Sequence, residues 1–173
     1  MSENLEVRRI RREEWQRLRT IRLDGLSDSP AAFILTAQEA RGFPNSYWEE
    51  RAMKGAVGGN QATMLVIDGE VTLGMAIGLM RPHISKTVAP IVSVYVSAAV
   101  RGRGLGRLLM DAVEDWASRN GAINTSLWVV ETNESARRFY ESRGYQTTPD
   151  RQLITKPPIR WEVRLAKDLT VAE

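Results

Sequence analysis

The amino-acid sequence predicts an α/β (α+β) fold of about seven strands and about four helices. Three observations lead to it: a hairpin signal near the middle of the chain, a glycine-rich loop that joins a β-branched segment to an amphipathic helix, and a return to strand-like periods near the end. The chain has 173 residues, of which 43% are hydrophobic and 26% are charged. That amount of apolar material suffices for one core and not for two. We therefore expect residues 1–173 to form a single domain.

The first sixty residues are expected to hold one strand and two helices. Leu5–Ile10 is typical of a short strand. A helix is predicted over Glu13–Leu26, ending near Gly25, from apolar residues at roughly helical intervals: Trp15, Leu18, Ile21 and Leu26. Ser46 is a suitable cap for a second helix that runs to Met53.

The middle of the chain carries the strand signals. Met64–Ile67 is a continuous apolar run, and Asp68-Gly69 is a two-residue hairpin signal. Apolar residues then alternate with small ones over Val71–Leu79, so this region predicts a β-hairpin. The β-branched and aromatic segment Ile91–Val96 is typical of a central strand.

The clearest helix of the sequence follows and is expected to end at Gly121. Its apolar residues recur at spacings of three and four: Leu105, Leu108, Leu109, Ala112, Val113 and Trp116. Thr125–Val130 then returns to a strand pattern, and Asn133 is a suitable cap for a shorter helix. Two closing strands are expected over Tyr145–Thr147 and Ile159–Leu165.

The composition excludes several kinds of chemistry. The chain has no cysteine and a single histidine, His83, so disulfides, thiolate nucleophiles and histidine-rich zinc sites are excluded, and we expect no metal. The start, MSENLEVRRI, has no apolar signal core, and the apolar stretch around Met75–Met80 is too short to span a bilayer. The sequence therefore predicts a cytoplasmic protein without a membrane partner.

The charge pattern indicates an anionic ligand more than a nucleic acid. The net charge is +3, and seven arginines between Arg8 and Arg22 are interleaved with acidic residues. Such a mixed cluster is typical of the solvated face of a helix, so we expect no nucleic-acid partner. Nothing in the composition decides between a monomer and a homodimer.

A glycine-rich loop connects the strand Ile91–Val96 to the clearest helix. Its residues are Arg101, Gly102, Arg103, Gly104, Leu105, Gly106 and Arg107. Free N–H groups at a helix start carry partial positive charge, glycines let an anion approach the backbone, and the arginines add full charge. The loop therefore suits a pyrophosphate, although a solvated turn with basic residues is the alternative.

Two common nucleotide loops do not match this segment. The G-x-x-x-x-G-K-[ST] loop requires a lysine and a hydroxyl where the chain has Arg107 and Leu108. The dinucleotide pattern G-x-G-x-x-G requires a third glycine where the chain has Arg107. The sequence therefore predicts neither an ATP nor an NAD site here.

Two motifs in order resemble the GNAT acetyltransferase superfamily. Arg101–Gly106 is similar to the family pattern [RQ]-x-x-G-x-[GA], between the fourth strand and the third helix. About thirty residues later, the strand Leu127–Val130 precedes residues that are similar to the family's N-x-x-A-x-x-F-Y-E and G-[FY] sequence: Asn133, Ala136, Phe139, Tyr140, Glu141, Gly144 and Tyr145. The resemblance spans Ile91–Thr147. It implies the GNAT fold, a mixed and mostly antiparallel sheet whose fourth and fifth strands splay apart.

The resemblance also implies acetyl-CoA as cosubstrate and an amine as acceptor. The pantetheine arm would lie between the splayed strands, and the pyrophosphate would lie on the amides of the loop. The residues so assigned to the cofactor are Val94, Tyr95, Val96, Arg101, Gly102, Arg103, Gly104, Leu105, Gly106, Arg107, Asn133 and Tyr140. The acceptor would be a primary amine of a small molecule, a protein N-terminus or a lysine, attacking the thioester directly in a ternary complex.

The resemblance implies that Tyr140 is the general acid that protonates the leaving thiolate. The alternative is a core aromatic residue whose hydroxyl reaches solvent. The strand before the loop lacks the carboxylate or imidazole that relatives often use as general base, which leaves Glu131, His83 or a water held by Ser93. A non-catalytic module that binds acetyl-CoA or RNA, and a transferase of longer acyl groups, are the competing functions.

Overall fold

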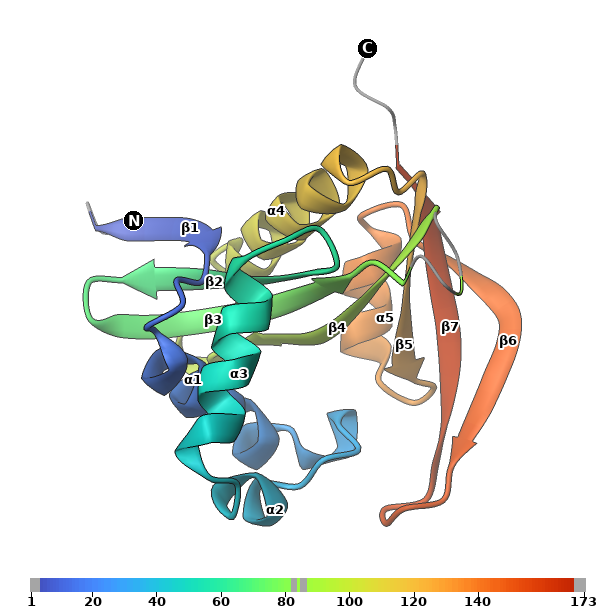
Figure 1. Cartoon of the computed structure of the whole chain (residues 1–173). Helices are drawn as coiled ribbons and strands as arrows, with labels where there is room; N and C mark the ends of the chain where they lie inside the picture. The colour runs from blue at the N-terminus through green and yellow to red at the C-terminus, as the bar shows by residue number, and fades with distance from the viewer. Residues whose placement is uncertain (1–3, 82–83, 85–86, 170–173) are drawn as a thin grey trace.

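The computed structural model describes residues 4–81, 84 and 87–169, and Figure 1 shows their arrangement. A seven-stranded sheet has the order β1-β2-β3-β4-β5-β7-β6. All neighbouring strands are antiparallel except β4 and β5, which are parallel. This mixed sheet with flanking helices confirms the predicted α/β fold. The strands are β1 (Leu5–Arg9), β2 (Gln61–Asp68), β3 (Val71–Leu79), β4 (Val88–Val96), β5 (Asn124–Val130), β6 (Gln146–Ile154) and β7 (Arg160–Asp168).

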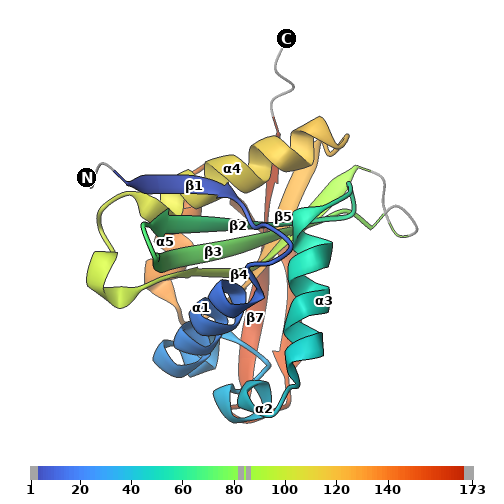
Figure 2. The ribbon, with the colours of Figure 1, turned by 60° about the vertical axis from the view of Figure 1, so that its left-hand side comes forward.

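Helices cover both faces of the sheet, as Figures 1 and 2 show. The described helices are α1 (Trp15–Asp28), α2 (Ala37–Arg41), α3 (Asn45–Ala56), α4 (Leu105–Arg119) and α5 (Glu134–Glu141), with two short 3-10 segments, Pro30–Ala32 and Ala98–Val100. One face packs against α1, α2 and α3, and the other against α4 and α5, so the apolar residues form two separate clusters. No helix within the described residues combines the length and the apolar character needed to cross a bilayer.

The β2–β3 hairpin explains why its sequence is apolar without interruption. Met64 and Val66 face the cluster under α4, whereas Leu65 and Ile67 face the cluster under α1 and α3. Because successive side chains of a strand point to opposite faces, a strand covered on both sides needs apolar residues at every position. The chain turns at Gly69, whose φ of 57° lies in the left-handed region.

Helix α1 extends past the position where the sequence predicted its end. Gly25 lies inside the helix and not at its end, which is Asp28. A Cβ at Gly25 would lie 3.0 Å from Cγ of Tyr95, so this glycine allows the helix to pack closely on the Tyr95 ring of β4. The glycine therefore serves close packing, which local helix-end signals do not distinguish from a cap.

The region between α1 and α3 contains a short helix that was not predicted. Thr36 and Glu39 form a capping box at the start of α2, in which each side chain bonds the other residue's backbone N–H. Glu39 also forms an ion pair with Lys156, with Nζ 2.6 Å from the carboxylate. This pair connects the α2 region to the β6–β7 hairpin, which is distant in sequence.

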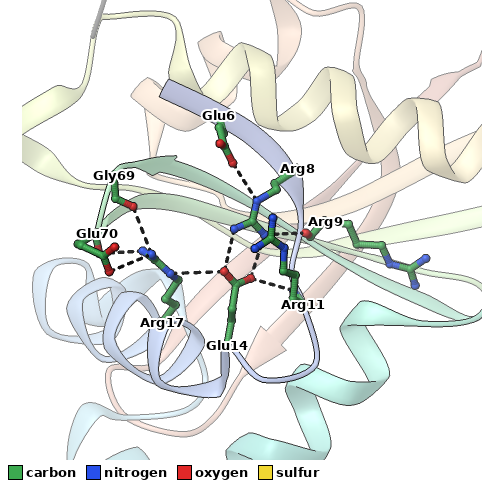
Figure 3. A network of polar contacts seen from close by, with 8 residues as sticks. All are labelled: Glu6, Arg8, Arg9, Arg11, Glu14, Arg17, Gly69 and Glu70. Carbon is green, nitrogen blue, oxygen red and sulfur yellow. Dashed lines mark hydrogen bonds and ion pairs between the residues drawn. The ribbon is translucent and has the colours of Figure 1, made fainter. Parts of the chain in front are cut away.

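The arginines near the N-terminus form a network with acidic side chains, shown in Figure 3. Arg8 donates two hydrogen bonds of 2.9 and 2.7 Å to the carboxylate of Glu14, and it also contacts Glu6 at 3.0 Å. Arg17 lies 3.5 Å from Glu14 and bonds the carbonyl of Glu70 in the β2–β3 turn. The guanidinium groups thus connect β1, α1 and that turn.

The hydrogen bonds from Arg8 lower the pKa of Glu14 from its ordinary value to about 2. A carboxyl whose pKa is lower in the folded chain stabilises the fold above the unfolded pKa, about 4.5, and this contribution is lost as pH falls toward 2. We expect Glu14→Gln to lower the free energy of unfolding by about 1–2 kcal/mol at pH 7. The difference from the parent protein should shrink below about pH 4.5 in urea titrations.

A matched control is Glu50→Gln, since Glu50 pairs with Lys54 one turn away on the surface of α3. This variant should unfold at nearly the parent urea concentration at pH 7. Equal losses from both variants would show that the half-buried position of Glu14 adds nothing to the stability of its ion pair.

Candidate active site

The central opening of the sheet arises where β4 and β5 separate. Their parallel pairing covers three positions only, Val88 with Asn124, Ala89 with Thr125 and Pro90 with Ser126. Beyond Pro90 the described residues of β4 have no partner on the β5 side, while β4 stays paired to β3 as far as Val96. The edge of β4 is therefore available to a ligand that lies between the strands.

A β-bulge bends β4 at this opening. Tyr95 pairs with Met75 and Val92 pairs with Ile77, so β4 contains one residue more than β3 over this interval. Ser93 in the bulge has a φ of 57°, which is unusual for a residue other than glycine. Such strained positions concentrate at functional sites, and here the bulge redirects the strand that forms one wall of the opening.

A single continuous cavity of about 1250 Å³ occupies the opening. Its lining joins the glycine loop and the start of α4 to the separated parts of β4 and β5, and it continues to the wall made by α1 and α3. Most of the residues predicted to bind a cofactor lie in this lining: Val94, Tyr95, Val96, Arg101, Gly102, Gly104, Leu105, Gly106, Arg107, Asn133 and Tyr140. Arg103 is exposed and does not line the cavity.

The glycine loop presents free backbone donors. Gly102 and Gly104 have φ values of 77° and 82°, and a Cβ on either would meet no atom within 4 Å. Gly104 is the N-cap of α4 and offers no side-chain bond. Among the described backbone hydrogen bonds of loops and caps, none is donated by an amide between Gly102 and Arg107. Free N–H groups at a helix start carry partial positive charge, which is the chemistry that an anion-binding loop requires.

Gly106 has a different role from the two glycines before it. A Cβ at this position would lie 3.2 Å from Cζ of Phe139, so the glycine lets α4 approach α5 closely. The third glycine of the loop thus positions the two helices, and the first two shape the turn.

The three arginines of the loop do not act alike. Arg101 donates to the Val96 carbonyl at 3.0 Å, forms an ion pair with Asp28, and lies 5.7 Å from the centre of the Tyr95 ring. It therefore fastens the loop to β4 and α1. Arg107 is exposed, lines the cavity and forms an ion pair of 4.0 Å with Asp111 of its own helix, an exposed contact that contributes little stability.

Tyr140 lines the cavity from α5 and is 8% exposed. Its ring packs edge-on against Phe139 and Tyr145. Burial raises the pKa of the Tyr140 phenol above its ordinary value, so the group stays protonated at neutral pH. No other described residue forms a hydrogen bond with this hydroxyl, which leaves it free to donate to a group in the cavity.

Asn133 combines the two roles that the sequence left open. Its Oδ1 accepts a hydrogen bond of 3.1 Å from the amide of Ala136, so it caps α5. It also lines the cavity, with its amide nitrogen not committed to any described residue. The cap holds α5 with Tyr140 beside the opening.

The carboxylates near the opening differ in placement. Glu131 pairs with Arg151 at 2.9 Å, its side chain is 38% exposed, and it does not line the cavity. Glu162 of β7 does line it and is 6% exposed, accepting a hydrogen bond of 2.8 Å from Gln152. Sequence reasoning missed Glu162 because a glutamate on a strand is usually on the solvent face. His83 lies outside the described residues.

The comparisons with known proteins decide the family. Residues 11–145 match the acetyltransferase (GNAT) family model, which is more than half of the chain. The chain belongs to the GNAT acetyltransferase family. The sequence resemblance found in the two motifs is thereby confirmed, and the match extends upstream to α1 and the β2–β3 hairpin.

Relatives of this GNAT protein are distant in sequence and close in fold. An acetyltransferase of the GNAT family from Streptococcus pneumoniae has a TM-score of 0.82 at 16% identity, covering 95% of this chain and 99% of that one. The structure of yncA from Salmonella typhimurium with its cofactor acetyl-CoA has a TM-score of 0.73 at 17% identity, with 98% and 96% covered. An N-acetyltransferase from Methanocaldococcus jannaschii is 33% identical over 61 residues, 35% of this chain. The chain spans 27% to 40% of the lengths of the curated relatives it matches.

Proposed function

We propose that this protein transfers the acetyl group of acetyl-CoA to a primary amine of a small molecule, a protein N-terminus or a lysine. The observation that carries the proposal is the continuous cavity, which joins the free amides of Gly102–Arg107 to the opening between β4 and β5 and to Tyr140. The cavity suits an acyl thioester of coenzyme A, because it combines three features: free amides for an anion, an unpaired strand edge and a buried proton donor.

The cofactor's parts would meet different surfaces of the cavity. The pyrophosphate would accept from the amides of the glycine loop, with Arg107 adding charge. The pantetheine arm, which carries amide groups, would bond the free edge of β4 near Val94 and Val96. A neighbour of the same fold, yncA, was solved with acetyl-CoA, which supports this choice of ligand.

The reaction needs two proton movements, for which the cavity offers two groups. The amine nitrogen bonds to the acetyl carbon, the carbon–sulfur bond breaks, and the electron pair leaves with sulfur. Tyr140 would protonate that thiolate, a role supported by its position in the cavity lining and by a phenol that stays protonated at neutral pH. Glu162 is placed to accept the proton that the amine loses, since its carboxylate faces the cavity beside Val130, the last residue of β5.

The competing function is a module that holds acetyl-CoA or RNA without turnover. The buried Tyr140 and Glu162 favour the enzyme, because binding alone has no use for two desolvated proton-transfer groups in one cavity. Release of free thiol from acetyl-CoA in the presence of an amine separates the two functions.

The first prediction concerns cofactor binding. Gly104→Ala should weaken acetyl-CoA binding about tenfold or more in calorimetric titration, because the added methyl group occupies the wall where the pyrophosphate approaches and disfavours the left-handed backbone. Gly121→Ala is the matched control, with a φ of 90°, open space around its Cβ and a position at the far end of α4. Equal binding by the two folded variants would remove the loop from the cofactor site.

The second prediction concerns the proton donor. Tyr140→Phe should lower kcat by about 10²–10⁴-fold with little change in acetyl-CoA affinity, because only a proton is removed. Tyr145→Phe provides the contrast, since its hydroxyl bonds Glu114 and Thr125 in the core, at 3.0 Å each. That variant should lower the melting temperature and retain kcat. A Tyr140→Phe rate within a factor of a few of the parent rate would assign Tyr140 to packing alone.

The third prediction separates the two carboxylates. Glu162→Gln should lower kcat/KM by about 10²-fold or more, because the amide that replaces the carboxylate cannot accept the proton that the amine loses. Glu131→Gln should change it little if Glu162 is the proton acceptor. The reverse ranking of these two variants would restore Glu131 as the base.

A further inference from the structure

We propose that the acceptor carries a carboxylate beside its amine, and that Arg22 and Arg51 bind this carboxylate. The inference rests on the proposed function and adds the class of acceptor to it. Both arginines line the part of the cavity bounded by α1, α3 and Phe33. This wall lies on the sheet face opposite α4, so it is separate from the glycine loop that would hold the pyrophosphate.

The ion pairs of the cavity identify these two arginines as exceptional. Seven charged side chains line the cavity within the described residues, and five of them are paired with a carboxylate or a cation. The pairs are Glu39 with Lys156, Arg101 with Asp28, Arg107 with Asp111, and Glu162 with Arg160. Arg22 and Arg51 are the two described lining charges without an ion pair, and their N–H groups have no acceptor among the described residues.

Aromatic rings hold both guanidinium groups in place. Arg22 lies 4.6 Å above the centre of the Phe33 ring, and Arg51 lies 4.6 Å above that of Tyr47. A guanidinium that lies over an aromatic ring gains a cation–π contact that uses none of its N–H groups, so these remain able to bind a carboxylate through two parallel hydrogen bonds. The wall thus fixes two cations while leaving their donors exposed to the cavity.

The position of Arg22 is unfavourable without an anion. Burial lowers its pKa from the ordinary value to about 10; Tyr47 raises the pKa and partly offsets this effect, and the nearby charge of Arg51 lowers it further. A desolvated cation beside a like charge destabilises the fold unless a counter-ion offsets it. Since no described carboxylate of the chain supplies that counter-ion, the bound acceptor is the natural source.

The amine end of such an acceptor has a place in the same cavity. Phe33 lies between Arg22 and the Glu162 region of the cavity. The Arg22 guanidinium lies over its ring, and its carbonyl accepts a hydrogen bond of 2.8 Å from Arg160. Arg160 in turn lies 4.0 Å from the carboxylate of Glu162. A molecule with a carboxylate at Arg22 and an ammonium group toward Glu162 would match both charges, which is the pattern of a free amino acid or of a peptide with an acidic residue near its N-terminus.

Matched acceptors that differ by one carboxylate test the proposal: lysine against cadaverine, arginine against agmatine, and phenylalanine against phenethylamine. With thiol release as the assay, at least one acid should have a kcat/KM about 10–100-fold above its decarboxylated partner. Arg22→Met keeps the apolar stem and removes the charge, so it should reduce that ratio toward one and retain the rate with the plain amine. A second pair of acceptors, alanyl-aspartate and alanyl-aspartate diamide, tests the peptide source. If the acceptor is a peptide with an acidic residue near its N-terminus, the dipeptide with free carboxylates should react faster than its diamide.

A stability measurement separates ligand binding from a structural role. If Arg22 serves only to pack on Phe33, Arg22→Met should lower the melting temperature and leave the acid preference intact. If it binds the acceptor, the melting temperature of the protein alone should stay equal or rise, because an unpaired desolvated charge is removed. Arg119→Met is the control, since Arg119 pairs with Asp115 on the surface of α4 and lies outside the cavity.

Product binding keeps the test independent of turnover. In calorimetry with coenzyme A present, N-acetylphenylalanine should bind about tenfold or more tightly than N-acetylphenethylamine, and Arg22→Met should abolish the difference. Plain amines acetylated as fast as their acids, with equal product affinities, would overturn the inference and leave the proposed function standing. Thiol release absent with every acceptor, while the carboxylate preference persists in product binding, would instead overturn the proposed function alone.

Discussion

The separation of β4 from β5 is the constraint on which the rest of the site depends. Parallel pairing ends at Pro90, which has no N–H to contribute to a ladder, and the bulge at Ser93 then bends β4 away. A continuous sheet would place hydrogen bonds where the cavity now lies. Instead, the open edge of β4, the glycine loop that follows it and Tyr140 on the far side all face one space.

A buried polar network around Glu114 connects α4, β7 and the end of α5. Glu114 of α4 accepts hydrogen bonds from Lys167 at 2.6 Å, from Tyr145 at 3.0 Å and from Arg143 at 3.2 Å. These contacts tie the middle of α4 to β7 and to the end of α5, so the helix that presents the free amides is anchored to the strand that carries Glu162. Because breaking such a network leaves a buried charge, it holds α4 more rigidly than apolar packing alone.

The parts of the fold that could be predicted are those whose signals are local. The hairpin at Asp68-Gly69 and the helix α4 follow directly from periodicity and turn chemistry, and both are confirmed. The predicted end of α1 near Gly25 was wrong. Gly25 lies inside the helix, where its missing side chain leaves room for the ring of Tyr95, 70 residues away in sequence. Likewise Leu108 was expected in the buried stripe of α4 and is 37% exposed, since α4 packs on the sheet through a narrower face.

The residues of the candidate site also fall into two groups: those specified by a short segment of chain, and those brought together by the fold. Gly102–Arg107 and the start of α5 each lie within a few residues of chain, so a motif can specify them and sequence reasoning finds them. Arg22, Arg51 and Glu162 come from α1, α3 and β7, and they share a cavity because of the fold alone. None of them stands in a pattern that differs from an ordinary surface charge. A cavity wall assembled in this way can change residue by residue without disturbing the glycine loop, because the shape of that loop depends on its own short segment of chain.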